Sequence, residues 1–254
     1  MLGDTIIDLT DSTYWGERQS NLGIPELTSP LSELLDAIIP FLEPYKNKKV
    51  IELGCSPGFV SSFICNKIKF IPFGIDLSPQ AHLYTLNMRR IANTESKLIR
   101  SDFRDFKCKT KFNVVMSFGL IEHFENFEEI FSQHHRLCQK NGLIVITIPN
   151  FSYLQKIYHL VFDKRDLKKH NTKIMNLKSF QYAAEKKNHE ILFLNYVGKI
   201  NFWGLDTDDH SLIVFFKKVA TSIIRFFTSL IFVRILPPNL KYYAPWIVYI
   251  GKKK

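Results

Sequence analysis

The chain has 254 residues, 46% of them hydrophobic, which suits one large domain or one domain with an insertion. Its net charge of +10 is uneven: residues 1–150 hold 16 Lys and Arg against 17 Asp and Glu, whereas residues 151–254 hold 18 against 7. The basic second part predicts an anionic partner, although a solvated basic face stays open. Four cysteines without paired spacing, and no basic, apolar leader, argue against a secreted disulfide framework and predict a cytoplasmic protein.

Short apolar stretches alternate with helical patterns along the chain. Residues 1–28 are polar and irregular and are expected to form an N-terminal cap segment. A helix is predicted to begin at Ser29–Pro30 and to end by Pro44, because Ser suits the N-cap and Pro the first turn. Further helices are predicted over 59–68, 78–92, 124–138 and parts of 151–190. The predicted strands begin at Val50 and continue with 70–76, 97–100, 112–117, 142–148, 191–197 and 245–250.

This alternation predicts an α/β fold, doubly wound, with a mostly parallel seven-stranded Rossmann-like sheet and helices on both faces. Ligands of such sheets bind at the carboxyl ends of the strands. Asp76, Asp102, Gly119 and Asn150 all fall at predicted strand ends. We therefore expect the functional site along this edge.

The turn from Gly54 to Gly58 matches the G-x-S-x-G pattern of serine hydrolases. That reading is rejected because Pro57, the residue after the serine, has no N–H for an oxyanion hole. A dinucleotide pattern fits poorly, because its second and third glycines fall on Ser56 and Phe59. No Lys-Ser/Thr pair follows, so a phosphate-binding Walker loop is excluded. A nucleoside ligand without a pyrophosphate remains.

Two aspartates support that ligand. Asp76 lies 18 residues after Gly58, a distance that suits a carboxylate binding a ribose diol at the end of the second strand. Asp102 and Phe103, after the third strand, are placed to meet an adenine. Each aspartate alone would also suit an ordinary ion pair or cap.

These stretches together resemble the class I S-adenosylmethionine-dependent methyltransferases, over about residues 29–150. The resemblance rests on the runs 50–58, 74–79, 102–103 and 117–124. It implies S-adenosylmethionine as the cofactor. The resemblance places Gly54, Cys55, Ser56 and Gly58 near the methionine part of the cofactor, and Asp76 with its neighbour Leu77 at the ribose. It places Asp102 and Phe103 at the adenine, and Ser117, Phe118 and Gly119 at the sulfonium. The sequence departs from the family at Ser56, where glycine is common.

The Glu122–His123 pair and the run 142–150 resemble a subgroup that contains ubiquinone-type O-methyltransferases and methyltransferases of surface-polysaccharide clusters. The Asn/Asp-Pro-Pro-Tyr motif of amino-group methyltransferases is absent after the fourth strand. The resemblance therefore implies methyl transfer to a hydroxyl of a small-molecule, sugar or lipid-linked substrate.

His123 is predicted as the general base, because histidine titrates near neutral pH and this one lies beside the fourth strand. His170 and His210 are further candidates, and a local structural role for His123 stays open. No metal site is predicted: His134, His135 and Cys138 are ligand-type residues, but they occupy one helix turn and have no matching second pair.

The segment Ser211–Leu236 is mostly apolar, but basic residues interrupt it, so no uncharged run reaches the about 18 residues of a membrane span. It resembles an interfacial basic amphipathic helix, or else a helix that covers the core or forms an oligomer contact.

Residues 29–254 are expected to form one methyltransferase domain, with substrate- or membrane-side insertions at 151–190 and 204–242. Peripheral contact with the inner face of the membrane is predicted. An RNA methyltransferase without a recognisable RNA module and a non-catalytic scaffold are the alternatives, and the oligomeric state stays open.

Overall fold

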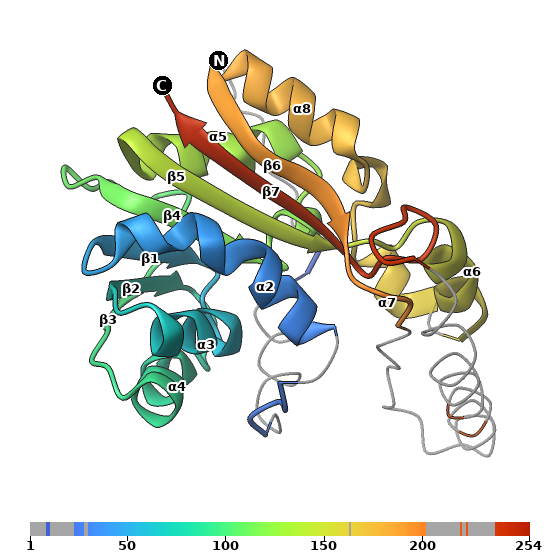
Figure 1. Cartoon of the computed structure of the whole chain (residues 1–254), viewed down its shortest axis with the longest axis horizontal. Helices are drawn as coiled ribbons and strands as arrows, with labels where there is room; N and C mark the ends of the chain where they lie inside the picture. Colours follow the sequence, from blue (N-terminus) through green and yellow to red (C-terminus); the bar gives the residue numbers. More distant parts are fainter. Residues whose placement is uncertain are drawn as a thin grey trace.

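A seven-stranded sheet forms the centre of the computed structural model, which describes residues 9–10, 23–27, 30–162, 164–201, 219, 222 and 237–254. Its strand order is β3-β2-β1-β4-β5-β7-β6 (Figure 1). The strands are β1 (Lys49–Leu53), β2 (Ile71–Asp76), β3 (Lys97–Arg100), β4 (Phe112–Phe118), β5 (Cys138–Pro149), β6 (His189–Val197) and β7 (Trp246–Lys253). Pairs from β3 to β5 are parallel, and β7 runs antiparallel to β5 and β6. The predicted Rossmann-like α/β fold is confirmed.

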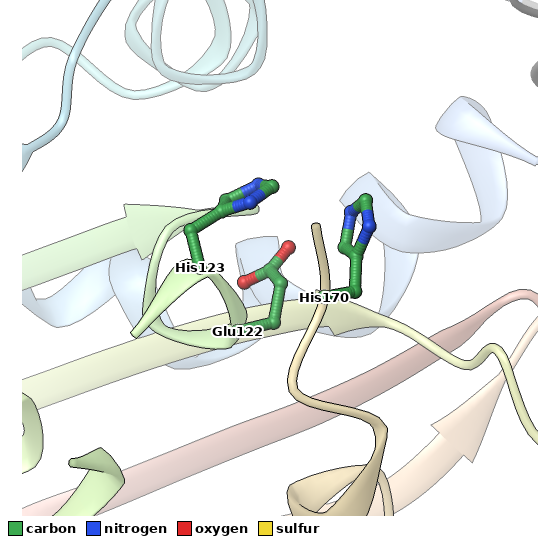
Figure 2. A group of neighbouring side chains, drawn as sticks. All are labelled: Glu122, His123 and His170. Atoms are coloured by element: carbon green, nitrogen blue, oxygen red, sulfur yellow. The ribbon is translucent and has the colours of Figure 1, made fainter. Parts of the chain in front are cut away.

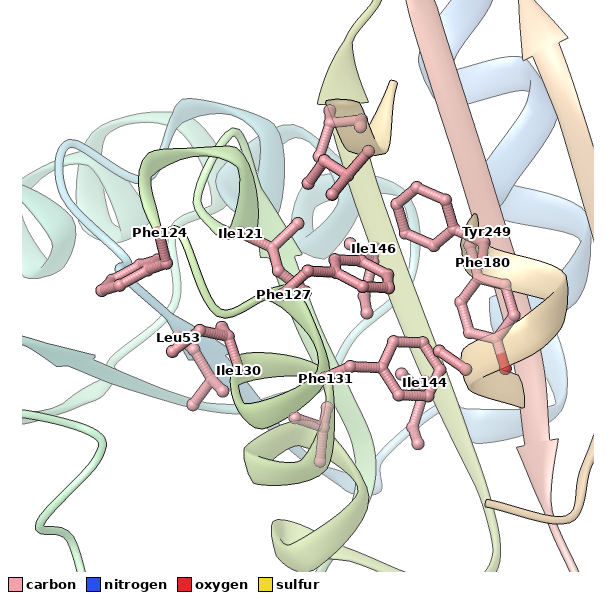
Figure 3. Packing of buried hydrophobic residues seen from close by; sticks show 14 of the residues in the cluster. Leu53, Ile121, Phe124, Phe127, Ile130, Phe131, Ile144, Ile146, Phe180 and Tyr249 are labelled. Atoms are coloured by element: carbon pink, nitrogen blue, oxygen red, sulfur yellow. The ribbon is translucent and has the colours of Figure 1, made fainter. Parts of the chain in front are cut away.

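The central strands bury both faces, which explains their continuous apolar sequence. Side chains alternate along each strand, so that Val50 joins the core on one face and Ile51 the core on the other. The first core is covered by α2 (Leu31–Leu42), α3 (Phe59–Lys67) and α4 (His82–Ala92). The second is covered by α5 (Phe127–Leu137) and α8 (Leu177–Lys186), where Phe131, Phe180 and Tyr249 pack together (Figure 3).

Two helix starts differ from the sequence prediction. The helix expected from Ser78–Pro79 begins only at His82, because residues 78–81 form a turn in which the Ala81 N–H donates to the Ser78 carbonyl at 3.1 Å. The Ser78 N–H donates to Asp76 Oδ1 at 2.7 Å. The helix expected over 124–138 begins at Phe127, where the Asn126 side chain caps it by accepting from the Glu129 N–H. A side-chain bond to the backbone therefore marks the start of α5, whereas the N-cap of α4, Ala81, makes no side-chain cap bond.

Other boundaries shift by smaller amounts. Helix α2 continues through Pro40 to Leu42, and a 3-10 turn, η1 (Glu43–Tyr45), follows it. Strand β5 begins at Cys138, four residues before the predicted Gly142. The Ser29 N-cap lies outside the described residues, as does most of the predicted cap segment 1–28.

The segment between β5 and β6 is helical, as the sequence indicated. It consists of α6 (Tyr153–Phe162), α7 (Lys164–Lys168), η3 (Thr172–Ile174) and α8. Figure 1 shows α6 and α7 beyond the carboxyl end of β5. Of the predicted amphipathic segment Ser211–Leu236, only Val219 and Ser222 are described. Within the described part of the chain, no helix has the length and apolar character needed to cross a membrane.

The second core contains a buried polar pair, His134 and Ser117. His134 on α5 is fully buried, its Nδ1 lies 2.9 Å from the Ile130 carbonyl, and its Nε2 lies 2.8 Å from Ser117 Oγ. Because a carbonyl only accepts, Nδ1 carries the hydrogen and Nε2 accepts the Ser117 hydroxyl. Burial lowers the pKa of His134 to about 4, so the ring is neutral at physiological pH.

Acid is therefore expected to destabilise the fold through His134. Below a pH of about 6.5 the imidazole of the unfolded chain binds a proton, whereas the imidazole of the folded protein stays neutral down to a pH of about 4. The free energy of unfolding therefore falls as the pH is lowered across this window. The parent protein should lose on the order of 3 kcal/mol more than His134→Gln between neutral pH and about pH 4. Urea unfolding at several pH values measures this difference, and parallel pH profiles would contradict it.

Candidate active site

The turn between β1 and α3 exposes backbone at the carboxyl edge of the sheet. The N–H groups of Gly54 and Cys55 both donate to the Ile75 carbonyl, at 2.9 and 3.3 Å, which ties the turn to β2. Gly54 has a φ of +63°, and a Cβ there would lie 2.6 Å from a Leu120 methyl. Gly58 has a φ of +79° and a Cβ would meet Tyr84 at 2.6 Å. Both positions therefore require glycine.

Asp76 fixes the other side of this turn. Its Oδ2 accepts the Ser56 N–H at 2.8 Å, and its Oδ1 accepts the Ser78 N–H at 2.7 Å. An ionised carboxylate has about four acceptor positions, so both oxygens keep the capacity to accept from a ligand hydroxyl. Leu77, beside it, is 60% exposed and offers an apolar surface at the same edge.

Asp102 lies one strand further along and is paired with Arg104. Arg104 Nε lies 2.9 Å from both carboxylate oxygens, and the Arg104 N–H donates to Oδ1 at 2.8 Å. Burial raises the pKa of Asp102, but the hydrogen bonds and charge of Arg104 outweigh it, so the net pKa is lowered. Sequence reasoning missed Arg104, whose guanidinium also lies 5.5 Å from the centroid of the Phe124 ring.

Three of the predicted cofactor residues point their side chains into the core. The Cys55 side chain is fully buried, with its Sγ directly beneath Gly74. Ser117 bonds His134, and Phe103 packs edge-on against Phe124 with ring centroids 5.7 Å apart. Cys55 and Ser117 can therefore meet a ligand only through their backbone.

The backbone at the end of β4 is less crowded than the turn around Gly54 and Gly58. Gly119, which follows Phe118, has a φ of +70° and its N–H donates to the Thr147 carbonyl at 2.9 Å. A Cβ on Gly119 would have only Glu122 Oε1 nearby, at 3.5 Å. The predicted sulfonium region thus adjoins the carboxylate of Glu122.

His123 lies directly after this opening, in η2 (Ile121–His123), and is 4% exposed. Its Nδ1 lies 3.0 Å from the Lys169 carbonyl, so Nδ1 carries the hydrogen and Nε2 carries the lone pair of the neutral ring. The His170 ring is close, with ring centroids 4.5 Å apart. From the N-terminal segment, the Leu9 N–H donates to the His123 carbonyl at 2.8 Å.

The structure thus brings His170, the second candidate base, to His123, whereas His210 lies outside the described residues. Figure 2 shows Glu122 between the two histidines. Sequence reasoning gave Glu122 no role, and no spacing signal links it to His170. The ligand-type residues His135 and Cys138 have other partners. His135 Nδ1 lies 2.8 Å from His189 Nε2, and the Cys138 thiol lies 3.6 Å from the Leu143 carbonyl.

A family described as a methyltransferase domain matches residues 27–204. The chain belongs to this family. This methyltransferase domain includes β1 to β6 and every site residue described above except Leu9. The predicted class I S-adenosylmethionine-dependent methyltransferase is confirmed.

Curated relatives of this methyltransferase domain share part of its length. It is 24% identical over 124 residues to the ubiquinone biosynthesis O-methyltransferase of Pelagibacter ubique (strain HTCC1062). The matched stretch covers 47% of this chain and 49% of that protein. It is 29% identical over 98 residues to the ribosomal RNA small subunit methyltransferase A of Mesomycoplasma hyopneumoniae (strain 232), 34% and 36% of the two chains. The chain thus spans about half, or less, of these relatives.

Solved methyltransferase structures share the whole fold. One is an S-adenosylmethionine-dependent methyltransferase from Thiobacillus denitrificans in complex with S-adenosyl-L-homocysteine, with a TM-score of 0.58, 16% identity and coverage of 95% of this chain and 98% of that one. Another is the N-methyltransferase NodS from Bradyrhizobium japonicum WM9, also with S-adenosyl-L-homocysteine, with a TM-score of 0.57, 11% identity and coverage of 96% and 99%. Identities this low show the fold alone.

S-adenosylmethionine is the cofactor of this methyltransferase, and the described residues fit it. Gly119 leaves bare backbone at the end of β4, where a Cβ would have only Glu122 Oε1 within 4 Å among the described residues, whereas the Cβ side of Gly54 faces Leu120. Asp76 presents a carboxylate suited to a ribose diol, and Asp102 lies at the next strand end. The assignment of individual residues to parts of the cofactor stays a prediction.

Asp76→Asn is expected to weaken cofactor binding at least about tenfold, because hydrogen bonds to a charged group contribute about 1.5–3 kcal/mol. Isothermal titration with S-adenosyl-L-homocysteine measures the change in Kd. Asp36→Asn, an exposed position on α2, is the matched control and should keep the parent affinity. Thermal unfolding of both variants checks the fold, because Asp76 also holds Ser56 and Ser78. An unchanged Kd for a folded Asp76→Asn would contradict the ribose role.

Proposed function

We propose that this methyltransferase transfers a methyl group from S-adenosylmethionine to a hydroxyl of a lipid-linked small molecule or sugar. The observation that carries the proposal is the placement of His123, whose Nε2 lone pair is fixed by the Nδ1–H bond to the Lys169 carbonyl, directly after Gly119. S-adenosylmethionine supplies an electrophilic methyl group on a sulfonium.

The chain itself must then align an oxygen with that methyl group and remove its proton. An imidazole in the neutral form accepts a proton at physiological pH, which suits a weakly acidic alcohol. Its fixed orientation avoids the cost of ordering the ring during the reaction. The similarity to a protein named ubiquinone biosynthesis O-methyltransferase adds support for an oxygen acceptor.

The lipid part of the proposal rests on α6. This helix buries Gln155 and His159 on its inner side, while its outer side exposes Leu154, Ile157, Leu160 and Val161, each between 43% and 61%. Exposed lysines lie on α6 and next to it in the chain or in space: Lys156 is on α6, Lys164 and Lys168 are on α7, and Lys241 Nζ lies 5.8 Å from the centroid of the Tyr153 ring on α6. α6 contains no Asp or Glu. An exposed apolar stripe with lysines nearby and no carboxylates on its helix suits binding to an anionic lipid surface.

The same helix connects this surface to the candidate site. On its inner side His159 packs on Phe151 with ring centroids 4.1 Å apart, and Phe151 packs on His170 at 4.7 Å. A helix is about 10–12 Å wide with its side chains. A substrate anchored in a bilayer under α6 would therefore have its head group within roughly one helix width of His123.

His123→Gln is expected to lower the rate of methyl transfer about 10²–10⁴-fold, the usual contribution of a general base, with cofactor affinity unchanged. The assay follows tritiated methyl from S-adenosylmethionine into a total lipid extract of the source cells. His82→Gln, an exposed histidine at the start of α4, is the matched control and should retain parent activity. A His123→Gln variant with parent activity would remove His123 from the chemistry.

The protein is expected to sediment with vesicles that contain anionic phospholipid, and less so as salt is raised. The double variant Ile157→Glu and Val161→Glu should lose most of this binding, because both side chains lie on the exposed stripe of α6. Leu86→Glu, 40% exposed on α4, is the control for adding a carboxylate elsewhere. Parent protein that stays in the supernatant at low salt would contradict the lipid part.

The two alternatives give different outcomes in these assays. An RNA methyltransferase would place the tritium in the RNA fraction and would bind RNA with a steep salt dependence. A non-catalytic scaffold would bind neither S-adenosylmethionine nor S-adenosyl-L-homocysteine in the titration.

A further inference from the structure

Glu122, His123 and His170 form a compact cluster beside the candidate active site. One carboxylate oxygen and one ring nitrogen of each histidine all lie within 4.8 Å of one another. Figure 2 shows the Glu122 carboxylate directed between the two imidazole rings. Glu122 is 1% and His123 4% exposed, while His170 is half-buried. The three residues come from two separate parts of the chain, η2 and the turn after α7.

Backbone hydrogen bonds hold these two parts together. The Asn171 N–H donates to the Glu122 carbonyl at 2.7 Å, and Asn171 Nδ2 donates to the carbonyls of Phe124 and Glu125 at 3.0 and 3.2 Å. Phe151 packs edge-on against the His170 ring from the other side. The cluster is therefore positioned by the fold and does not depend on flexible surface side chains.

The tautomer of His123 suits a metal ligand. Its Nδ1–H donates to the Lys169 carbonyl, which leaves the lone pair on Nε2. Metal-bound histidines usually donate their second ring N–H to a carbonyl or carboxylate in this way, which orients the ring and raises its basicity. A carboxylate as buried as that of Glu122 is also stabilised by a nearby cation.

We propose that Glu122, His123 and His170 bind a divalent transition-metal ion of the Zn²⁺ or Mn²⁺ class. Two imidazoles and one carboxylate form a ligand set that such ions accept. Ligand atoms around one ion lie roughly 3–3.5 Å apart at the usual metal–ligand distances of about 2.0–2.2 Å. The ligand atoms, which now lie within 4.8 Å of one another, must move closer to reach this spacing when an ion binds.

Three protein ligands leave coordination positions open, as in catalytic rather than structural sites. Glu122 also connects the cluster to the predicted methyl-transfer region, because its Oε1 is 3.5 Å from the Cβ position of Gly119. This inference rests on the proposed function, methyl transfer to a hydroxyl, and assigns His123 a different part in it: His123 is a ligand of the ion and not the general base. The ion binds the acceptor oxygen and lowers the pKa of its hydroxyl. The hydroxyl proton passes to solvent, the oxygen forms a bond to the methyl carbon, and the carbon–sulfur bond breaks with its electron pair on sulfur. The ion keeps its oxidation state.

The test measures metal binding directly in the full-length protein. After treatment with EDTA and dialysis, isothermal titration with Zn²⁺ is expected to show one saturable site. Addition of Co²⁺ should give the visible absorption bands of a nitrogen- and oxygen-ligated ion. Glu122→Gln and His170→Gln should each raise the Zn²⁺ Kd at least about 100-fold, because they remove a direct ligand and even outer-shell changes cost 10–100-fold.

His82→Gln is the matched control, since it removes an exposed imidazole on α4 and should keep the parent Zn²⁺ affinity. If Glu122→Gln fails to fold, His170→Gln alone decides the question, because His170 lies in a turn and is half-buried. No saturable binding by the parent, or equal Kd values for parent and His170→Gln, would overturn the metal site. Titration with S-adenosyl-L-homocysteine is independent of these results, so loss of the metal proposal and loss of the methyltransferase function are distinguishable.

Discussion

The parallel alignment of β1 to β5 is the constraint on which the site depends. Parallel strands end at one edge of the sheet, so Gly54, Asp76 and Gly119 meet there although they are distant in sequence. These strands are buried on both faces, and a slip of one residue would exchange the two cores. The hydrophobic cores therefore fix the positions of the polar groups at the edge.

The segment between β5 and β6 lies against this edge and is the proposed acceptor side of the site. Its turn around Asn171 is bonded to the backbone of η2, which places His170 beside His123. Helix α6 in the same segment has a buried inner side, which reaches His170 through Phe151, and an exposed apolar outer side. One insertion thus joins the candidate catalytic histidines to a surface suited to lipid.

Local sequence signals predicted most of the fold and the positions of the site residues. The strands were found within a few residues because short apolar runs between turns are typical of buried parallel strands. The predicted start of α4 was wrong because residues 78–81 form a turn before the helix, which helix-start patterns do not distinguish from a first helical turn. The directions of the Cys55 and Ser117 side chains were likewise hidden, since they depend on which core each residue faces.

The sequence by itself determined the Rossmann-like fold, the methyltransferase family and the edge that holds Gly54, Asp76 and Asp102. It did so because strand periodicity, turn glycines and strand-end carboxylates are properties of residues close together in the chain. Only the tertiary structure decided that Glu122, His123 and His170 meet, that Arg104 pairs with Asp102 and that His134 is buried against Ser117. The Glu122–His123–His170 cluster and the His134–Ser117 contact both join residues from separate elements, so they form only when those elements pack together. The orientation of the Arg104 side chain depends on its surroundings at the strand end.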